Sequence, residues 1–291
     1  MNQYEFLLRS RTPFLGIETS FQDAKFFVFG VPYDLSSSFR RGASAGPEAV
    51  RKFSANIEAN SYRTKADLSA AKIFDGGDVV YDVKLPKMLA RVNRVVAEID
   101  ADGKIPIMIG GEHTFTYAAV KALKKKASSL IVFDAHFDLR DDYAGLKMNH
   151  ASYLRRLVEK NPPLPVAVVG VRGYDFSEEA YARERKISYV KACELDDVSR
   201  VLRVLSETVA GGRPYISVDI DVFDPAFAPG VGNPEPEGAH PSQIIDLVKF
   251  LGKYHPVGFD LMEVNPAFDT GSTAALAARM IFEFMASVEE T

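Results

Sequence analysis

Aspartate and histidine side chains follow three separate apolar runs of the chain, and their spacing is typical of a metal site. The runs cover residues 105–109, 130–133 and 215–218, and each has the length of a short strand. Alternate residues of an extended chain point to the same side, so the acids and histidines of each segment would lie together. The candidate metal ligands are His113, Asp134, His136, Asp138, Asp219 and Asp221.

These side chains predict a pair of divalent cations. Four carboxylates that share a site repel one another, and some would have to take up protons unless cations offset their charge. Carboxylate oxygen and imidazole nitrogen, with no sulfur nearby, favour manganese, with zinc as the alternative. Four aspartates around two dications come close to neutrality. One hydroxide between the ions would leave the centre slightly negative, which suits a cationic substrate.

The alternative for any one of these segments is ordinary polar surface at the end of a strand. A single Asp-x-Asp would favour that alternative, but three such segments together favour the metal site. Of the five histidines, His113, His136 and His150 lie in or just after these segments, whereas His240 and His255 are interpreted as surface or loop residues. A glycine pair before His113 could cradle phosphate. The Walker and GxGxxG patterns are absent, so we expect these glycines to make a tight turn.

The elements that must position these residues alternate between strands and helices. Continuous apolar runs are typical of a parallel sheet that helices cover on both faces. We therefore predict a three-layer α/β/α sandwich with a mostly parallel, about eight-stranded central sheet, formed by residues 1–291 as a single domain. Such sheets bind ligands beyond the carboxyl ends of their strands. The predicted strands are 26–30, 72–74, 105–109, 130–133, 166–169, 187–190, 215–218 and 258–261. The predicted helices are 47–60, 85–99, 114–125, 150–159, 177–185, 194–209, 241–251 and 272–286.

Composition narrows the class of protein. The 291 residues carry 39 acidic and 35 basic side chains, a net charge of −4, which argues against a general nucleic-acid binder. The single cysteine, Cys193, cannot form an internal disulfide, which agrees with a reducing cytoplasm. Residues 1–6 lack the charged and apolar regions of a signal peptide, and no apolar run approaches the ~20 residues of a membrane span. We expect a cytoplasmic protein that binds neither nucleic acid nor membrane.

Five segments resemble the ureohydrolase family, which includes arginases and agmatinases. The longest is Ser217-Val218-Asp219-Ile220-Asp221-Val222-Phe223-Asp224-Pro225, continuing to Gly230. The others are Gly111-Glu112-His113-Thr114, Asp134-Ala135-His136-Phe137-Asp138, Gly30-Val31-Pro32-Tyr33-Asp34 and Met262-Glu263-Val264-Asn265-Pro266. The chain departs from common family patterns at Glu112, Phe137, Asn233 and Glu237. The last two could alter the mouth of the site.

The resemblance implies an arginase-like fold, two manganese ions and a hydroxide between them. One ion would be held by His113, Asp134, Asp138 and Asp219, and the other by His136, Asp134, Asp219 and Asp221. Glu263 would pair with the guanidinium of the substrate, and His150 would lie near the substrate and shuttle protons. Asp138 is our candidate for donating a proton to the leaving amine. Family members are often trimers or hexamers, so a homo-oligomer is implied.

The segment after the second motif favours agmatine as the substrate. Arginases carry an Asn and a Ser-Gly-Asn segment that hold the carboxylate of the amino acid. Here position 140 is Arg, the Ser-Gly-Asn is missing, and residues 139–143 with 149–151 look more like agmatinases. Asp141 or Asp142 could offer a counter-charge to the amine of agmatine, although solvated loop charges are the more ordinary interpretation. Arginine and guanidino acids such as guanidinobutyrate remain alternatives, because Arg140 could pair with a carboxylate.

Two other classes of protein are alternatives to a two-metal hydrolase. A non-catalytic family member would have lost a ligand, and none is lost here. A metal-dependent deacetylase on a related fold would have a single-metal site and a catalytic tyrosine motif. The pair Asp219 and Asp221, together with Glu263, argues against the deacetylase.

Overall fold

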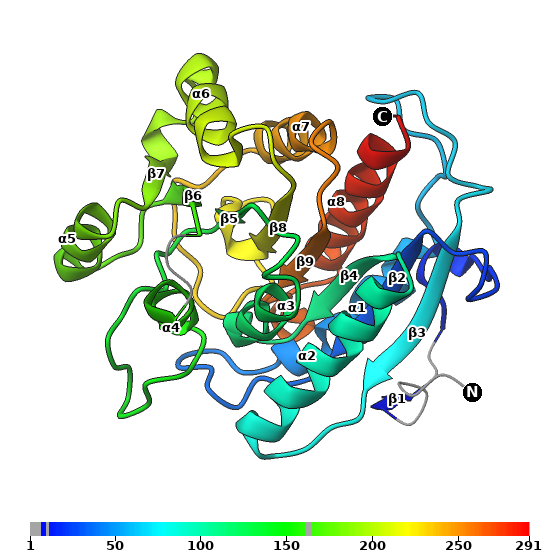
Figure 1. Ribbon diagram of the computed structural model, residues 1–291, viewed down its shortest axis with the longest axis horizontal. Coiled ribbons are helices and arrows are strands. Elements are labelled where there is room, and N and C mark those ends of the chain that lie inside the picture. The colour runs from blue at the N-terminus through cyan, green and yellow to red at the C-terminus, as the bar shows by residue number, and fades with distance from the viewer. Residues whose placement is uncertain (1–6, 10–11, 161–163, 291) are drawn as a thin grey trace.

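A twisted parallel sheet runs through the centre of the protein, and helices cover both of its faces (Figure 1). The computed structural model describes residues 7–9, 12–160 and 164–290, so the expectation about residues 1–6 lies outside the described part. The strands are β1 (Leu8–Arg9), β2 (Phe26–Val31), β3 (Ile73–Val79), β4 (Ile105–Gly110), β5 (Ser129–Phe133), β6 (Val166–Val171), β7 (Ser188–Lys191), β8 (Pro214–Asp219) and β9 (Gly258–Met262).

The strand order is β1-β3-β2-β4-β9-β8-β5-β6-β7. Eight strands are mutually parallel, and the short edge strand β1 pairs antiparallel with β3. The predicted three-layer fold with about eight mostly parallel strands is therefore confirmed. β4 and β5 follow each other in the chain, but β9 and β8 lie between them in the sheet. The strand order thus reverses here, and such a switch point opens a crevice beyond the carboxyl ends of the strands.

The helices divide between the two faces because side chains alternate along each strand. Val28 packs in one core with α1, α6, α7 and α8, while its neighbours Phe27 and Phe29 pack in the other with α2, α3, α4 and α5. The α-helices are α1 (Gly46–Ser54), α2 (Leu85–Ala101), α3 (Thr116–Ala122), α4 (Tyr153–Lys160), α5 (Phe176–Glu184), α6 (Val198–Val209), α7 (Pro241–Gly252) and α8 (Ser272–Glu289). Short 3₁₀ turns include His113–Phe115 and Ile220–Val222.

Two element boundaries differ from the prediction for identifiable reasons. β3 extends past the predicted residue 74, because the Arg51 guanidinium binds the carboxylates of Asp75 and Asp78 at 2.8 and 2.6 Å and so allows two acids in a buried strand. The helix predicted from residue 150 begins only at Tyr153. The Asn149 side chain accepts a hydrogen bond from the backbone N–H of Ala151, which holds the preceding residues in a turn.

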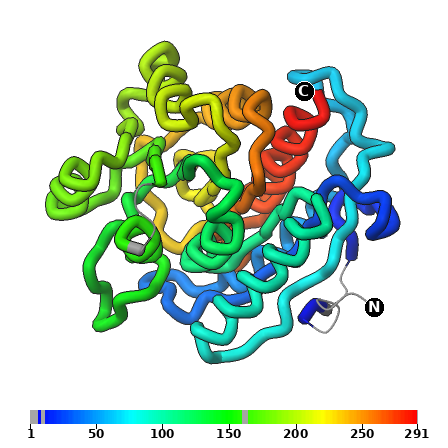
Figure 2. Tube along the Cα trace, in the orientation of Figure 1, coloured from blue at the N-terminus to red at the C-terminus, as the bar shows by residue number. Residues whose placement is uncertain are grey.

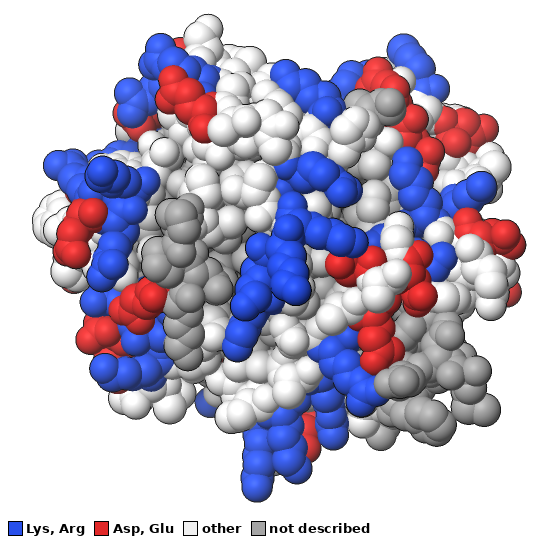
Figure 3. Space-filling view, in the orientation of Figure 1, with Lys and Arg blue, Asp and Glu red and all other residues white. Residues whose placement is uncertain are grey.

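The C-terminal helix α8 packs against α1 and α7 on one face of the sheet. In Figure 2 it runs beside the segment that leads into β3, and Ser61 in that segment donates a hydrogen bond of 2.7 Å to the buried Glu283 of α8. The face in Figure 3 carries both acidic and basic side chains, with the basic ones gathered over α3. Within the described residues, no helix combines the length and apolar character needed to cross a bilayer.

Candidate metal centre and substrate cavity

The predicted ligands come from strands β4, β8 and β5, whose carboxyl ends meet at one edge of the sheet. His113 begins the turn after β4, Asp219 ends β8 with Asp221 in the following turn, and the segment 134–138 follows β5. β9 lies between β4 and β8 and is followed by Glu263. The four neighbouring strands at the switch point therefore supply every candidate metal ligand and the acid expected to bind the guanidinium.

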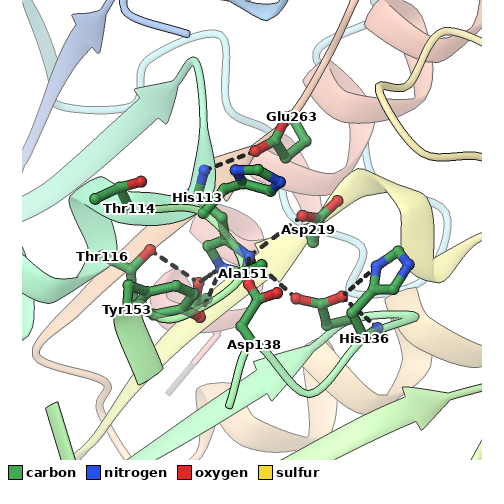
Figure 4. A network of polar contacts seen from close by, with 12 residues as sticks. His113, Thr114, Thr116, His136, Asp138, Ala151, Tyr153, Asp219 and Glu263 are labelled. Atoms are coloured by element: carbon green, nitrogen blue, oxygen red, sulfur yellow. Dashed lines mark hydrogen bonds and ion pairs between the residues drawn. The ribbon is translucent and has the colours of Figure 1, made fainter. Parts of the chain in front are cut away.

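The first group of ligands surrounds Nδ1 of His113. This atom lies 3.1 Å from Oδ2 of Asp134, 3.3 Å from Oδ2 of Asp138 and 3.2 Å from Oδ2 of Asp219. Figure 4 shows the side chains of His113, Asp138 and Asp219 pointing toward one another. All four residues are buried, so water cannot screen their charges.

The second group surrounds Nδ1 of His136. This atom lies 3.1 Å from Oδ2 of Asp221 and 3.5 Å from Oδ1 of Asp134. Asp134 therefore belongs to both groups, each carboxylate oxygen facing a different histidine. The ligand atoms within the set His113, Asp134 and Asp219, and within the set Asp134, His136 and Asp221, lie within 4.8 Å of one another.

The segment 134–138 brings its side chains together in a way that simple alternation did not predict. The strand ends at Phe133, and Asp138 has a φ of 52°, in the left-handed region that non-glycine residues rarely adopt. This turn, rather than a continued extended strand, carries the Asp138 carboxylate back to His113. Such strain at a polar site is common where the arrangement serves a function.

The electrostatics of the centre fit bound cations. Burial and the neighbouring Asp134 raise the pKa of Asp138 to about 7, and burial with Asp221 raises that of Asp219 well above its usual range. Nδ1 of His113 and Oδ2 of Asp134 are buried and 3.1 Å apart, yet neither has a hydrogen-bond partner among the described residues. Buried polar atoms are otherwise almost always partnered, so a cation between them is the ordinary way to satisfy both. The donor set of oxygen and imidazole nitrogen suits manganese or zinc.

A hydrogen-bonded network behind His113 fixes the orientation of its ring. Nε2 lies 2.8 Å from the hydroxyl of Ser217, which donates to Asp260 at 2.5 Å. Asp260 also accepts hydrogen bonds from Tyr215 and Thr116, and the Ser217 hydroxyl, which gives its own proton to Asp260, can only accept from Nε2. Nε2 therefore carries the proton, and the lone pair of Nδ1 faces the carboxylates, as a metal ligand requires. The sequence analysis missed this network, although Asp260 as an acid inside an apolar strand is a visible signal.

Glu263 lies at the base of the centre. Its carboxylate accepts a 2.8 Å hydrogen bond from the backbone N–H of His113, and its φ is 65°. Burial raises its pKa well above the usual range. A buried carboxylate with unused acceptor sites beside a metal centre can bind a planar cation.

His150 faces the centre from the turn before α4. The hydroxyl of Ser36 donates to Glu112 at 2.9 Å and lies 3.2 Å from Nδ1 of His150. The proton of His150 therefore sits on Nδ1, and Nε2 is the acceptor nitrogen, hydrogen-bonded to the hydroxyl of Ser38 at 3.4 Å. Burial lowers the pKa of His150 to about 4, so the ring is neutral at neutral pH. The sequence analysis did not single out Ser36 or Ser38.

The glycine pair before His113 allows close packing where the chain bends. A Cβ on Gly111 would overlap the backbone of Tyr33, and one on Gly110 would overlap the side chain of Met262. The chain bends at Gly111 and Glu112, between the end of β4 and the 3₁₀ turn that begins at His113, and neither glycine has a positive φ. The departures at 112 and 137 leave the ligands intact, because Glu112 binds Ser36 and Thr114 while Phe137 is buried against Tyr174 and Tyr189. His240 and His255 are exposed, as predicted.

Two connected cavities lead to this centre. The inner one, of about 10 Å³, is lined by His113, His136, Asp138, His150, Asp219, Asp221, Asn233 and Glu263. The outer one, of about 250 Å³, is lined by Ser38, His136, Asp138, Arg140, Tyr143, His150, Ala151, Gly173, Tyr174, Glu178, Asn233 and Glu235. Four residues line both cavities, so a narrow polar pocket opens into a wider one.

Asp141 and Asp142 line neither cavity, so the structure does not support them as partners of a substrate amine. The Asp141 side chain is 56% exposed and pairs with Arg156 at 2.9 Å and with Arg155 at 3.5 Å. Asp142 accepts a hydrogen bond from the backbone N–H of Gly145. Both acids stabilise the surface loop, whereas Arg140 does line the outer cavity and lies 3.6 Å from Glu178.

Comparisons with known proteins agree with this geometry. The sequence model of the arginase family matches residues 24–287. The agmatinase of Pyrococcus horikoshii is 35% identical over 266 residues, which are 90% of this chain and 91% of that protein. The guanidinopropionase of Pseudomonas aeruginosa is 34% identical over 275 residues, 91% of this chain and 86% of that protein. The crystal structure of the agmatine ureohydrolase of Thermoplasma volcanium matches with a TM-score of 0.90 and 35% identity, covering 97% of this chain and 96% of that one.

Proposed function

Since this chain belongs to the arginase family of hydrolases, we propose that it cleaves agmatine to putrescine and urea with two manganese ions. The observation that carries the proposal is the convergence of two ligand groups, sharing Asp134, beside the free acceptors of Glu263. The same proposal includes manganese, a single domain over residues 1–291, a cytoplasmic location and a trimeric or hexameric assembly, which the sequence or its resemblance to the family implies.

The proposed ligand sets follow the two groups. His113, Asp134, Asp138 and Asp219 would hold one ion, and His136, Asp134, Asp219 and Asp221 the other. When bound, the ions would supply a nucleophile at neutral pH, because a bound divalent ion lowers the pKa of water from 15.7 to about 7.

The remaining residues would bind the substrate and handle protons. The Glu263 carboxylate would pair with the guanidinium, whose planar N–H groups match a carboxylate in a bidentate arrangement. Asp138 would pass a proton to the leaving amine. His150 would accept a proton at Nε2 and return it to the cavity, since its ring is neutral near pH 7 and lines the inner cavity.

Agmatine is favoured over arginine because the segment that holds the amino-acid carboxylate in arginases is absent here. A guanidino acid is the second candidate, because Arg140 lines the outer cavity. The similarity to a guanidinopropionase supports the same candidate.

The proposal is tested by measuring urea release from agmatine, arginine and 4-guanidinobutanoate after the protein has been loaded with manganese. We expect the highest kcat/KM for agmatine and loss of activity in a chelator. A higher kcat/KM for arginine or for the guanidino acid would overturn the choice of substrate. No urea from any guanidino compound at full manganese occupancy would overturn the hydrolase itself.

A further inference from the structure

The wall of the outer cavity carries two carboxylates that neither metal group uses, Glu178 and Glu235, and only Glu178 pairs with an arginine among the described residues. Glu235 lies in the loop after the β8 motif, with its side chain 41% exposed and Oε1 3.8 Å from Nε2 of His136. It therefore lies on the far side of His136 from the ligand atoms. Glu263 lines the inner cavity and Glu235 the outer one, with His136 bordering both.

The loop that carries Glu235 is fixed through its backbone, and its side chain packs over Gly173. A Cβ on Gly173 would lie 2.9 Å from Cγ, Cδ and Oε1 of Glu235, so a larger residue there would displace the side chain. Arg172 donates hydrogen bonds to the backbone carbonyl oxygens of Glu235 and Pro236 at 2.8 and 2.9 Å. The arginine thus fixes the loop through its backbone and directs no hydrogen bond to the carboxylate.

Among the described residues that line the outer cavity and belong to neither ligand group, Glu235 is the carboxylate that no arginine or lysine contacts directly. Arg140 lies 3.6 Å from Glu178, whose side chain is 5% exposed, so these two charges largely offset each other. Arg172 attracts the Glu235 carboxylate from nearby, but its guanidinium donates to backbone carbonyl oxygens. A carboxylate without a directly bound cation at the wide end of a pocket favours a cationic group at that end.

We propose that Glu235 binds the ammonium end of a substrate whose guanidinium binds Glu263, which makes Glu235 the residue that selects amine-terminated over acid-terminated guanidino compounds. This inference rests on the proposed function and assigns the recognition first expected of Asp141 and Asp142 to a different acid. The same carboxylate disfavours a substrate that ends in a carboxylate, by repulsion between like charges.

A competing role for Glu235 is to orient His136 through Nε2, as carboxylates behind metal-binding histidines often do. The two roles differ in what they affect. Orientation of a ligand changes activity on every substrate and weakens manganese binding. Recognition of the ammonium group changes only the substrates that carry one.

The test compares E235Q with E237Q. Glu237 was expected to alter the mouth of the site but lines neither cavity, so this variant removes an equal charge from an exposed position two residues along the same loop. Urea release is measured with manganese-loaded protein on agmatine, on n-butylguanidine, which has no charge on its tail, and on 4-guanidinobutanoate. We expect E235Q to lower kcat/KM for agmatine roughly tenfold or more, as loss of a hydrogen bond to a charged group does. It should leave kcat/KM for n-butylguanidine within about twofold of the wild-type value and raise kcat/KM for the guanidino acid. E237Q should match the wild type.

Equal losses of kcat/KM on agmatine and n-butylguanidine, or a higher manganese requirement in E235Q, would overturn the recognition role in favour of orientation of His136. Unchanged kinetics on agmatine would also overturn it. A wild-type protein that releases urea from none of the three compounds would refute the proposed function, and this inference with it. Urea release from agmatine by the wild type, with the same kcat/KM in E235Q, would refute this inference alone.

Discussion

Replacing Ser217 with alanine would remove the hydroxyl that links the ring of His113 to the buried carboxylate of Asp260. In the structure this hydroxyl accepts from Nε2 of His113 at 2.8 Å and donates to Asp260 at 2.5 Å. After the change, the Tyr153 hydroxyl, 3.0 Å from the same nitrogen, is the remaining partner of the ring. Asp260 keeps its hydrogen bonds from Tyr215 and Thr116.

The size of the effect follows from what is left unpaired. A buried polar group that loses its partner costs about 1–3 kcal/mol, which corresponds to roughly 5- to 150-fold in an equilibrium constant. Loss of a residue behind a metal ligand usually lowers affinity about 10- to 100-fold. Because Tyr153 remains, we expect the manganese affinity of Ser217→Ala to fall roughly tenfold, near the lower end of these ranges. Adding Tyr153→Phe should bring the loss close to 100-fold.

The assay is a titration of metal-free protein with manganese, in which calorimetry measures the affinity and the recovery of urea release measures the activity. Ser129→Ala is the matched control, because its hydroxyl is equally buried in neighbouring strand β5 but has no hydrogen-bond partner among the described residues. At saturating manganese the Ser217→Ala variant should regain most of its kcat. A manganese affinity equal to that of the control would refute the reasoning that this network orients His113.

Four further outcomes are expected. Asp219→Ala should abolish manganese binding and urea release together, since this residue belongs to both proposed ligand sets, and full activity would contradict those sets. Glu263→Gln should bind manganese normally but lose kcat/KM on every guanidino substrate, and a loss of metal content instead would contradict its role. Arg51→Leu should lower the free energy of unfolding in urea by about 3–5 kcal/mol, because it removes the guanidinium that binds the buried carboxylates of Asp75 and Asp78; a loss below about 1 kcal/mol would contradict this. The folded-state pKa of His150, about 4, lies below the unfolded value near 6.5, so the neutral ring stabilises the fold fully above pH 6.5 and this stability is lost as pH falls toward 4. Between pH 6.5 and 4 the free energy of unfolding of the metal-free wild type should therefore fall on the order of 3 kcal/mol more than that of His150→Gln.

Much of the fold could be predicted because the strands are apolar on both faces. Runs such as 130–133 and 215–218 lie within strands of the structure, and the parallel order follows from their alternation with helices. The errors came where long-range contacts override local pattern. β3 contains Asp75, Gly76, Gly77 and Asp78, which suggest a turn until Arg51, far away in the sequence, supplies the charge that lets them be buried.

The metal centre was predictable because its ligands follow strand ends in short motifs. The structure brings the six predicted ligands together with Glu263, while their roles stay proposals. What could not be predicted depends on backbone turns and on residues distant in sequence. The left-handed Asp138 and the Ser36–His150 contact give no local signal, and Asp260, although visible as an acid inside an apolar strand, does not reveal Ser217 as its partner. Asp141 and Asp142 looked like candidates for the opposite reason, since proximity to a motif in sequence did not mean proximity to the cavity.

The insertion of β9 and β8 between β4 and β5 bears on how the chain matures during synthesis. The ribosome releases β4 and β5 long before the two strands that fill the space between them. Asp219, Asp221 and Glu263 therefore join the centre last, after His113 and the segment 134–138 have already emerged. A nascent or truncated chain holds only part of the coordination set. Full binding of metal therefore requires a complete polypeptide in which β8 and β9 have been inserted correctly between β4 and β5.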